Sequence, residues 1–116
     1  MSKLLFIVND APYGSERAYN ALRLAGALTS RENVAVRVFL MADAVGCAKN
    51  LQKVPEGYYN IQLMLAKVLR KGDVALCGTC MDARGLQDTE LKAGARRSTL
   101  NELADWTLEA DKVLMF

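Results

Sequence analysis

The sequence predicts an α/β fold in which helices cover a largely parallel sheet. Apolar runs of strand length alternate along the chain with segments whose apolar residues recur at helical spacing. The runs are continuously apolar, which is typical of strands buried on both faces. The 116 residues match the length of one ordinary domain, and we expect a single domain over residues 1–116.

The first strand is expected at Leu4–Val8, because this apolar run ends in the turn-rich segment Asn9–Ser15. A helix is expected next, with Ser15 as its N-cap. The apolar residues of this helix fall on one face: Ala18, Ala21, Leu22, Ala25 and Leu28. It should end near Arg31–Asn33.

Val34–Met41 predicts the second strand, because it is rich in Val, Phe and Leu. Ala42–Ala48 predicts one short helix, followed by a linker that contains Asn50, Pro55 and Gly57. Helical spacing returns in four apolar residues: Ile61, Met64, Leu65 and Val68.

Two cations and a glycine, Arg70–Gly72, end that helix and lead to a third strand at Val74–Cys77. A short fourth strand is expected near Lys92–Arg96. Thr99 and Glu102 match a capping box at the start of a last helix. Its expected inner face is Leu100, Leu103, Ala104 and Thr107, with Trp106 to one side, and Val113–Phe116 predicts a last strand.

In a parallel sheet, the loops that follow the strands emerge at one edge, where such sheets hold their ligands. The loops Asn9–Gly14, Ala42–Cys47 and Cys77–Gly85 should therefore face one another. All three cysteines, Cys47, Cys77 and Cys80, fall at this edge.

The odd number of cysteines argues against a secreted disulfide scaffold and for free or reactive thiols. Histidine is absent, which excludes imidazole-based acid and base catalysis, Ser-His and Cys-His nucleophile pairs, and zinc sites with imidazole ligands.

The spacing Cys77-Gly78-Thr79-Cys80 places a CxxC pair between a strand and a helix. Thr79 is expected as the N-cap, with Cys80 as the first helical residue and Gly85 closing the helix. A helix start and the nearby Arg84 would lower the pKa of a thiol at Cys80. For Cys77 alone and for Cys47 a packing role is favoured, whereas for the pair, placed between a strand and a helix, a functional role is favoured.

Two other interpretations of the thiols fit less well. A thioredoxin-like dithiol relies on a proline opposite the pair, and no proline follows Pro55. A metal site would have to combine the three cysteines with Asp43 or Asp82, which is unlike the usual Cys/His sets. No metal is therefore expected.

The charge balance and hydropathy limit the partners. Fifteen Lys and Arg against thirteen Asp and Glu give a net charge of +2, without the basic excess of a nucleic-acid binder. A solvated face is the favoured interpretation of the cluster of Lys92, Arg96 and Arg97. No apolar stretch has the length of an export signal or a bilayer span, so we expect a cytoplasmic protein with no membrane partner.

Several segments together resemble the DsrE/DsrF-like family of small sulfur-relay proteins along the whole chain. The segments that carry the resemblance are Asn9–Glu16, Phe39–Val45, Gly57–Gln62, Cys77–Gly85 and Ala110–Leu114. The resemblance implies a three-layer α/β/α sandwich around a five-stranded parallel sheet and assembly into trimers or hexamers. It also implies a strand-end cysteine that carries persulfide sulfur between partner proteins, and this cysteine corresponds to Cys77, followed by Arg84 and Gly85.

The leading hypothesis is a homo-oligomeric sulfur carrier in which Cys77 or Cys80 takes sulfur from a donor and passes it to an acceptor. Sulfur is then the cargo, and no cofactor is required. The expected lining of the site is Asp10, Tyr13, Asp43, Thr79 and Arg84. Two alternatives stay open: a small-ligand or assembly module with structural cysteines, and a dithiol oxidoreductase.

Overall fold

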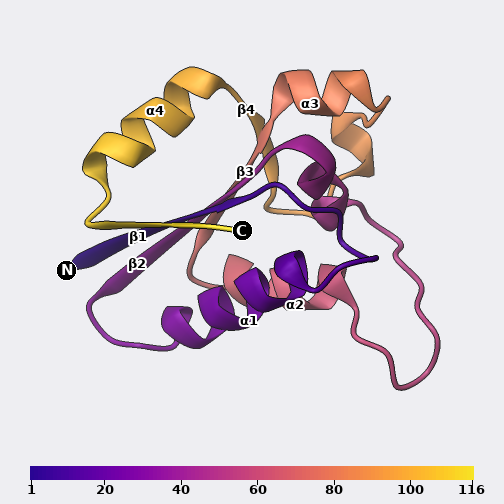
Figure 1. Ribbon diagram of the computed structural model, residues 1–116, viewed down its shortest axis with the longest axis horizontal. Helices are drawn as coiled ribbons and strands as arrows, with labels where there is room; N and C mark the ends of the chain where they lie inside the picture. Colours follow the sequence, from indigo (N-terminus) through magenta and orange to yellow (C-terminus); the bar gives the residue numbers. More distant parts are fainter.

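A five-stranded parallel sheet forms the centre of the computed structural model, which describes residues 1–116 (Figure 1). Its strand order is β4-β3-β2-β1-β5. The strands are β1 (Ser2–Val8), β2 (Val34–Leu40), β3 (Asp73–Cys77), β4 (Arg96–Ser98) and β5 (Lys112–Met115). This arrangement confirms the expected parallel sheet and its five strands.

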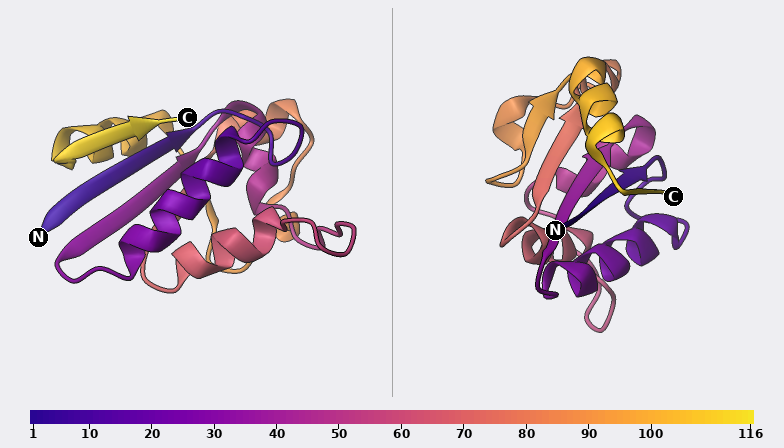
Figure 2. Two further views of the ribbon diagram at one scale, coloured as in Figure 1. Left: turned by 60° about the horizontal axis from the view of Figure 1, so that its bottom comes forward. Right: turned by 90° about the vertical axis from the view of Figure 1, so that its left-hand side faces the viewer.

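Helices lie on both faces of the sheet, with α1 and α2 on one side and α4 on the other (Figures 1 and 2). The helices are α1 (Arg17–Thr29), α2 (Ile61–Leu69), α3 (Gly78–Ala83) and α4 (Leu100–Glu109), with 3-10 turns η1 (Ala42–Ala48) and η2 (Asp88–Glu90). The chain steps from β1 through β2 and β3 to β4 in one direction across the sheet and then returns past β1 to β5. Because such crossovers are right-handed, the return through α4 covers the opposite face.

The two faces of the sheet bury unequal cores. A cluster of 22 buried residues fills the side of α1 and α2. The side of α4 holds six buried residues: Leu5, Ile7, Phe39, Ala75, Leu103 and Trp106. The rings of Phe39 and Trp106 meet edge to face, with their centroids 6.1 Å apart. A single helix therefore covers this face, and parts of it stay open to solvent.

The first helix begins one residue later than expected. Glu16, not Ser15, is the N-cap, and no side chain caps this end. The Ser15 hydroxyl donates instead to Asp10, at 2.7 Å. The predicted apolar face is buried at its four alanine and leucine positions up to Ala25, whereas Leu28 is half-buried.

The prediction for the last helix is only partly confirmed. Thr99 caps α4 by accepting the Glu102 N–H, but the Glu102 carboxylate bonds Arg96 and Ser98 rather than the Thr99 backbone. Of the expected inner face only Leu103 is buried: Leu100 is 69% exposed, and Trp106, expected to one side, is buried instead. The indole packs on Phe39, which turns the helix away from the Leu100 face.

The fourth strand lies four residues beyond its expected start. Leu91 forms an antiparallel bridge with Lys49, and the Lys92 N–H donates to the Ala48 carbonyl. Gly94 then turns the chain with φ of +99°, a backbone angle that glycine adopts without strain. The pairing with β3 begins only at Arg96, opposite Ala75.

Candidate functional site

The candidate site lies where β2 and β3 end. These strands are parallel neighbours, so η1 and α3, which follow them, leave the sheet at the same edge. This arrangement agrees with the expected meeting of the loops that start at Ala42 and Cys77. Cys77 and Cys80 are both half-buried at this edge, and all three cysteines are free thiols.

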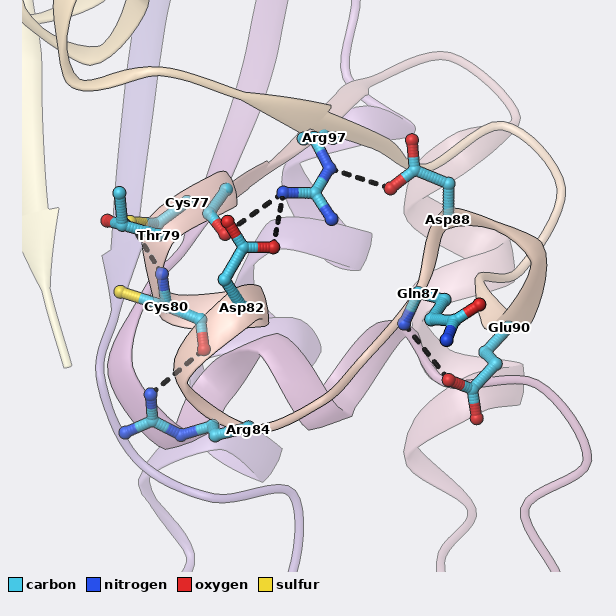
Figure 3. Close-up of polar contacts among 10 residues, drawn as sticks. Cys77, Thr79, Cys80, Asp82, Arg84, Gln87, Asp88, Glu90 and Arg97 are labelled. Carbon is cyan, nitrogen blue, oxygen red and sulfur yellow. Dashed lines mark hydrogen bonds and ion pairs between the residues drawn. The ribbon is translucent and has the colours of Figure 1, made fainter.

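Cys77 itself is the N-cap of α3, which corrects the prediction that Thr79 caps this helix. The Cys80 N–H donates to Cys77 Sγ at 3.4 Å, and the Thr79 hydroxyl lies 3.2 Å from the same sulfur (Figure 3). The helix therefore begins at Gly78, two residues earlier than expected. As a result Cys80 lies a full three residues into the first turn, and its N–H faces the other sulfur.

These contacts act on the ionisation of Cys77. Burial by itself raises the pKa of this thiol, but hydrogen bonds from Cys80 and Thr79 outweigh burial and hold the pKa below its ordinary value of 9.0. Hydrogen bonds that donors give to a sulfur favour its charged form. Cys77 is therefore the thiol of the pair that ionises first, in contrast to the expectation from helix position, which favoured Cys80.

The pKa of the Cys80 thiol is shifted in the opposite direction, above its ordinary value. Burial and its hydrogen bond with Cys77 raise the pKa of the Cys80 thiol, and a hydrogen bond from the Ala42 backbone and the charge of Arg84 offset part of that rise. Ala42 adopts φ of +51°, in the left-handed region that residues with a Cβ rarely enter. This conformation at the end of β2 accompanies the contact between the Ala42 N–H and the Cys80 sulfur.

Arg84 and Asp43 join the turn to η1. The guanidinium of Arg84 donates to Asp43 Oδ1 at 2.9 Å and to the Cys80 carbonyl at 3.1 Å. Arg84 thus folds back over the turn that carries Cys80, as its spacing of four residues predicts. The structure brings three of the expected lining residues, Thr79, Asp43 and Arg84, to the two cysteines.

Asp10 and Tyr13 make their contacts elsewhere. Asp10 accepts from Ser15 and lies 3.9 Å from Arg17 Nε. The Tyr13 hydroxyl donates to Gln52 and accepts the N–H of Ile61. Both residues hold the loop after β1 in place, and neither contacts Cys77 or Cys80.

Cys47 is fully buried in the core on the side of α1 and α2. Burial raises the pKa of this thiol to about 12. It is a packing residue, as its sequence context indicates.

Two contacts of the site carry no clear sequence signal. A left-handed alanine at position 42 cannot be read from sequence, since glycine and asparagine are the residues that usually adopt this conformation. Arg97 donates to the Gly78 carbonyl at 3.1 Å, next to Cys77. The expected fourth strand ends at Arg96, and Arg97 is expected on a solvated face, so no sequence signal pointed to this contact.

No three Cys, Asp or Glu side chains lie close enough together to hold a metal ion. No helix has the length and apolarity to cross a bilayer.

Comparisons with known proteins agree with this fold. The chain is 50% identical to Protein YchN of Escherichia coli, over all of both chains, and its fold matches the YchN crystal structure with a TM-score of 0.94. An uncharacterized protein of Methanocaldococcus jannaschii is 37% identical over 98% of this chain and 99% of its own. A protein of unknown function from Methanobacterium thermoautotrophicum, 11% identical, shares the fold over both full chains with a TM-score of 0.79. The model of the DsrE/DsrF-like family matches residues 2–116, and this chain belongs to that family.

Proposed function

We propose that this protein is a sulfur carrier and that Cys77 is the thiol that accepts sulfur as a persulfide. The observation that carries the proposal is the hydrogen bonding of Cys77 Sγ, which lies half-buried at the strand end and receives the Cys80 N–H. A sulfur nucleophile must be both ionised and accessible. The lowered pKa of Cys77 favours its thiolate, and its sulfur is partly accessible, whereas Cys47 is buried and its pKa is raised.

The accepting step is a transfer of one neutral sulfur atom. The Cys77 thiolate attacks the outer sulfur of a donor persulfide, R–S–SH, and forms Cys77–S–SH. The S–S bond of the donor breaks, and its electron pair leaves with R–S⁻. No external oxidant or reductant takes part, because the sulfane sulfur keeps its oxidation state.

Cys80 offers one route for release. Cys80 lies in the turn that Cys77 caps, and its N–H donates to Cys77 Sγ. Attack of the Cys80 thiolate on Cys77 Sγ forms a Cys77–Cys80 disulfide and expels HS⁻. The two thiols are oxidised and the sulfane sulfur is reduced, so a dithiol reductant must restore the protein. Attack of an acceptor thiol on the outer sulfur is the alternative route and leaves Cys77 reduced.

The proposal includes a homo-oligomer, a trimer or hexamer, in the cytoplasm, with sulfur donor and acceptor proteins as partners. Exposed apolar side chains support assembly, because large apolar groups at the surface mark contacts between proteins. The most exposed of these are Met1, Leu51, Leu63, Leu100, Leu108 and Met115, each at least 67% exposed. Two of them, Leu100 and Leu108, lie on α4, over the thinly covered face of the sheet.

Intact mass spectrometry tests the carrier function. The reduced protein is incubated with a low-molecular-weight persulfide and then separated from it. We expect a gain of one sulfur atom, lost in Cys77→Ser and retained in the matched control Cys47→Ala. In Cys80→Ser the adduct should accumulate, because disulfide release is blocked.

An adduct that is absent even in Cys80→Ser, where disulfide release is blocked, or an adduct that persists in Cys77→Ser, would overturn the proposal. A reversible Cys77–Cys80 disulfide in a protein that never takes up sulfur would instead identify a dithiol oxidoreductase.

A further inference from the structure

Arg97, on the edge strand β4, donates hydrogen bonds to three residues of the segment that joins β3 to β4. From β4, Arg97 Nη1 donates to the Gly78 carbonyl at 3.1 Å and to Asp82 Oδ1 at 3.0 Å. Its Nε donates to Asp88 Oδ1, in η2, at 2.7 Å. Figure 3 shows the guanidinium between the two carboxylates, against the outer side of α3.

The backbone at Gly78 is shaped to admit this side chain. A Cβ at position 78 would lie 3.2 Å from both Cγ and Nη1 of Arg97 and 3.0 Å from the Ser98 carbonyl oxygen. These distances are shorter than ordinary van der Waals contact, so a larger residue would push the arginine away. Glycine at the first position of α3 therefore permits the contact between Arg97 and the turn.

The short helix α3 needs contacts with the rest of the protein to be stable. α3 has six residues, and a helix of that length is not stable alone, since nucleation costs more than the few hydrogen bonds return. Gly78 and Asp82 lie four residues apart on the same side of α3, so Arg97 Nη1 spans one whole helical turn. On the other side, Arg84 joins the end of the helix to Asp43.

We propose that Arg97 is a positioning residue, which holds the first turn of α3 so that the Cys80 N–H points at Cys77 Sγ. This inference rests on the proposed function, because it assigns Arg97 to the turn that would accept sulfur. Arg97 does not contact either sulfur. It holds the peptide group between Gly78 and Thr79, which lies one residue before the Cys80 N–H that donates to Cys77 Sγ, and it thereby orients the first turn.

The contribution of Arg97 is geometric rather than a matter of net charge. The side chains of Asp82 and Asp88 are 70% and 64% exposed, and exposed ion pairs contribute little to stability. The charged and titratable groups around the turn are Cys80, Asp82 and Arg84 on α3, Asp43 on η1, Asp88 on η2 and Arg97 itself. Two carboxylates already neutralise the Arg97 charge, so its donors matter through their directions.

The test is the pH profile of alkylation at Cys77 by iodoacetamide, followed in the tryptic peptide Gly72–Arg84, whose fragments separate Cys77 from Cys80. In Arg97→Met we expect the profile to move to higher pH. At neutral pH the rate should fall roughly three- to tenfold, because part of a hydrogen bond to a charged sulfur is lost. Arg97→Lys keeps the charge but not the forked donors, and it should behave like Arg97→Met.

Arg96→Met is the matched control. Arg96 also lies on β4 and bonds carboxylates, but its partners are Asp73 and Glu102, and it stacks over Trp106 at 5.7 Å. Its removal should leave the Cys77 profile unchanged. A wild-type profile in Arg97→Met would overturn the inference, and so would a wild-type profile in Arg97→Lys.

A second variant keeps the test decisive if Arg97→Met does not fold, as judged by circular dichroism. Asp88→Asn weakens the hold on Arg97 Nε and should shift the Cys77 profile in the same direction by a smaller amount, whereas no shift would overturn the inference. Alkylation requires no sulfur donor. A protein that takes up no sulfur even as Cys80→Ser, with the Arg97 effect intact, would therefore refute the carrier function alone.

Discussion

The connections after β2 and β3 leave neighbouring strands at the same edge of the sheet, and each carries a cysteine, but they place the sulfur in opposite surroundings. In η1, Cys47 is buried in the larger core, and its pKa is raised to about 12. At the start of α3, Cys77 is half-buried and receives hydrogen bonds, and its pKa is lowered. Position at the ligand-binding edge therefore does not by itself make a thiol reactive.

The direction of nearby donors makes the difference. After β2 the chain forms a 3-10 turn whose inner residues, including Val45 and Cys47, point into the core. After β3 it forms a helix whose first turn directs the Cys80 N–H at the strand-end sulfur. Burial without donors suppresses ionisation, and donors at a partly open site promote it.

The largest expected effect is on stability at high pH. Cys47→Ala removes the buried thiol, and with it one side of this comparison. The folded pKa of Cys47, about 12, lies above its ordinary value of 9.0, so the neutral thiol is favoured by folding. That contribution is complete below pH 9 and is lost as the pH rises toward 12. Between pH 8 and 11 the wild type should lose about 2–3 kcal/mol more stability than Cys47→Ala. Urea unfolding at both pH values measures the difference, and parallel losses would contradict the burial of Cys47.

Tyr13→Phe should have a smaller effect, confined to stability. It removes the hydroxyl that accepts the Ile61 N–H and donates to Gln52, at a cost of about 1–2 kcal/mol. Alkylation of Cys77 and uptake of sulfur should match the wild type. Thermal unfolding measures the loss of stability, and the alkylation and sulfur-uptake assays measure the reactivity of Cys77. Slower reaction at Cys77 would show that the loop after β1 belongs to the site.

The smallest expected effect comes from Arg84→Met. The Arg84–Asp43 pair is partly exposed, so its loss should cost no more than about 1 kcal/mol of stability. The Arg84 charge lowers the pKa of Cys80, and without it that pKa should rise further. Site-resolved alkylation should thus slow at Cys80 and stay nearly constant at Cys77. Asp43→Asn serves as the control, because it breaks the same ion pair and keeps the Arg84 cation. A larger effect of Arg84→Met at Cys77 than at Cys80 would contradict the assignment of the Arg84 charge to Cys80.

The sequence was sufficient for the elements with strong periodic signals. Continuous apolar runs located β1, β2 and β3, and helical spacing located α1 and α2, because burial on a sheet imposes those periods. The last helix was harder. Its apolar residues lie on more than one side, and only the packing of Trp106 on Phe39 determines which side is buried.

At the candidate site, sequence placed Thr79, Asp43 and Arg84 near the cysteines, but helix position ranked Cys80 ahead of Cys77, whereas the family resemblance pointed to Cys77. Both Thr79 and Cys77 can cap a helix. With Thr79 as the N-cap, Cys80 would be the first helical residue, whereas with Cys77 as the N-cap the Cys80 N–H donates to the Cys77 sulfur. The start of this helix depends on tertiary contacts, among them the close approach of Arg97 to Gly78. Local propensity does not contain this information.

Separate alkylation profiles for Cys77 and Cys80 in the reduced wild-type protein test the central claim most directly. We predict that Cys77 becomes reactive at a pH below the ordinary thiol value of 9.0 and that Cys80 becomes reactive above it. Reaction of Cys80 at lower pH than Cys77 would contradict the assignment of Cys77 as the sulfur-accepting thiol.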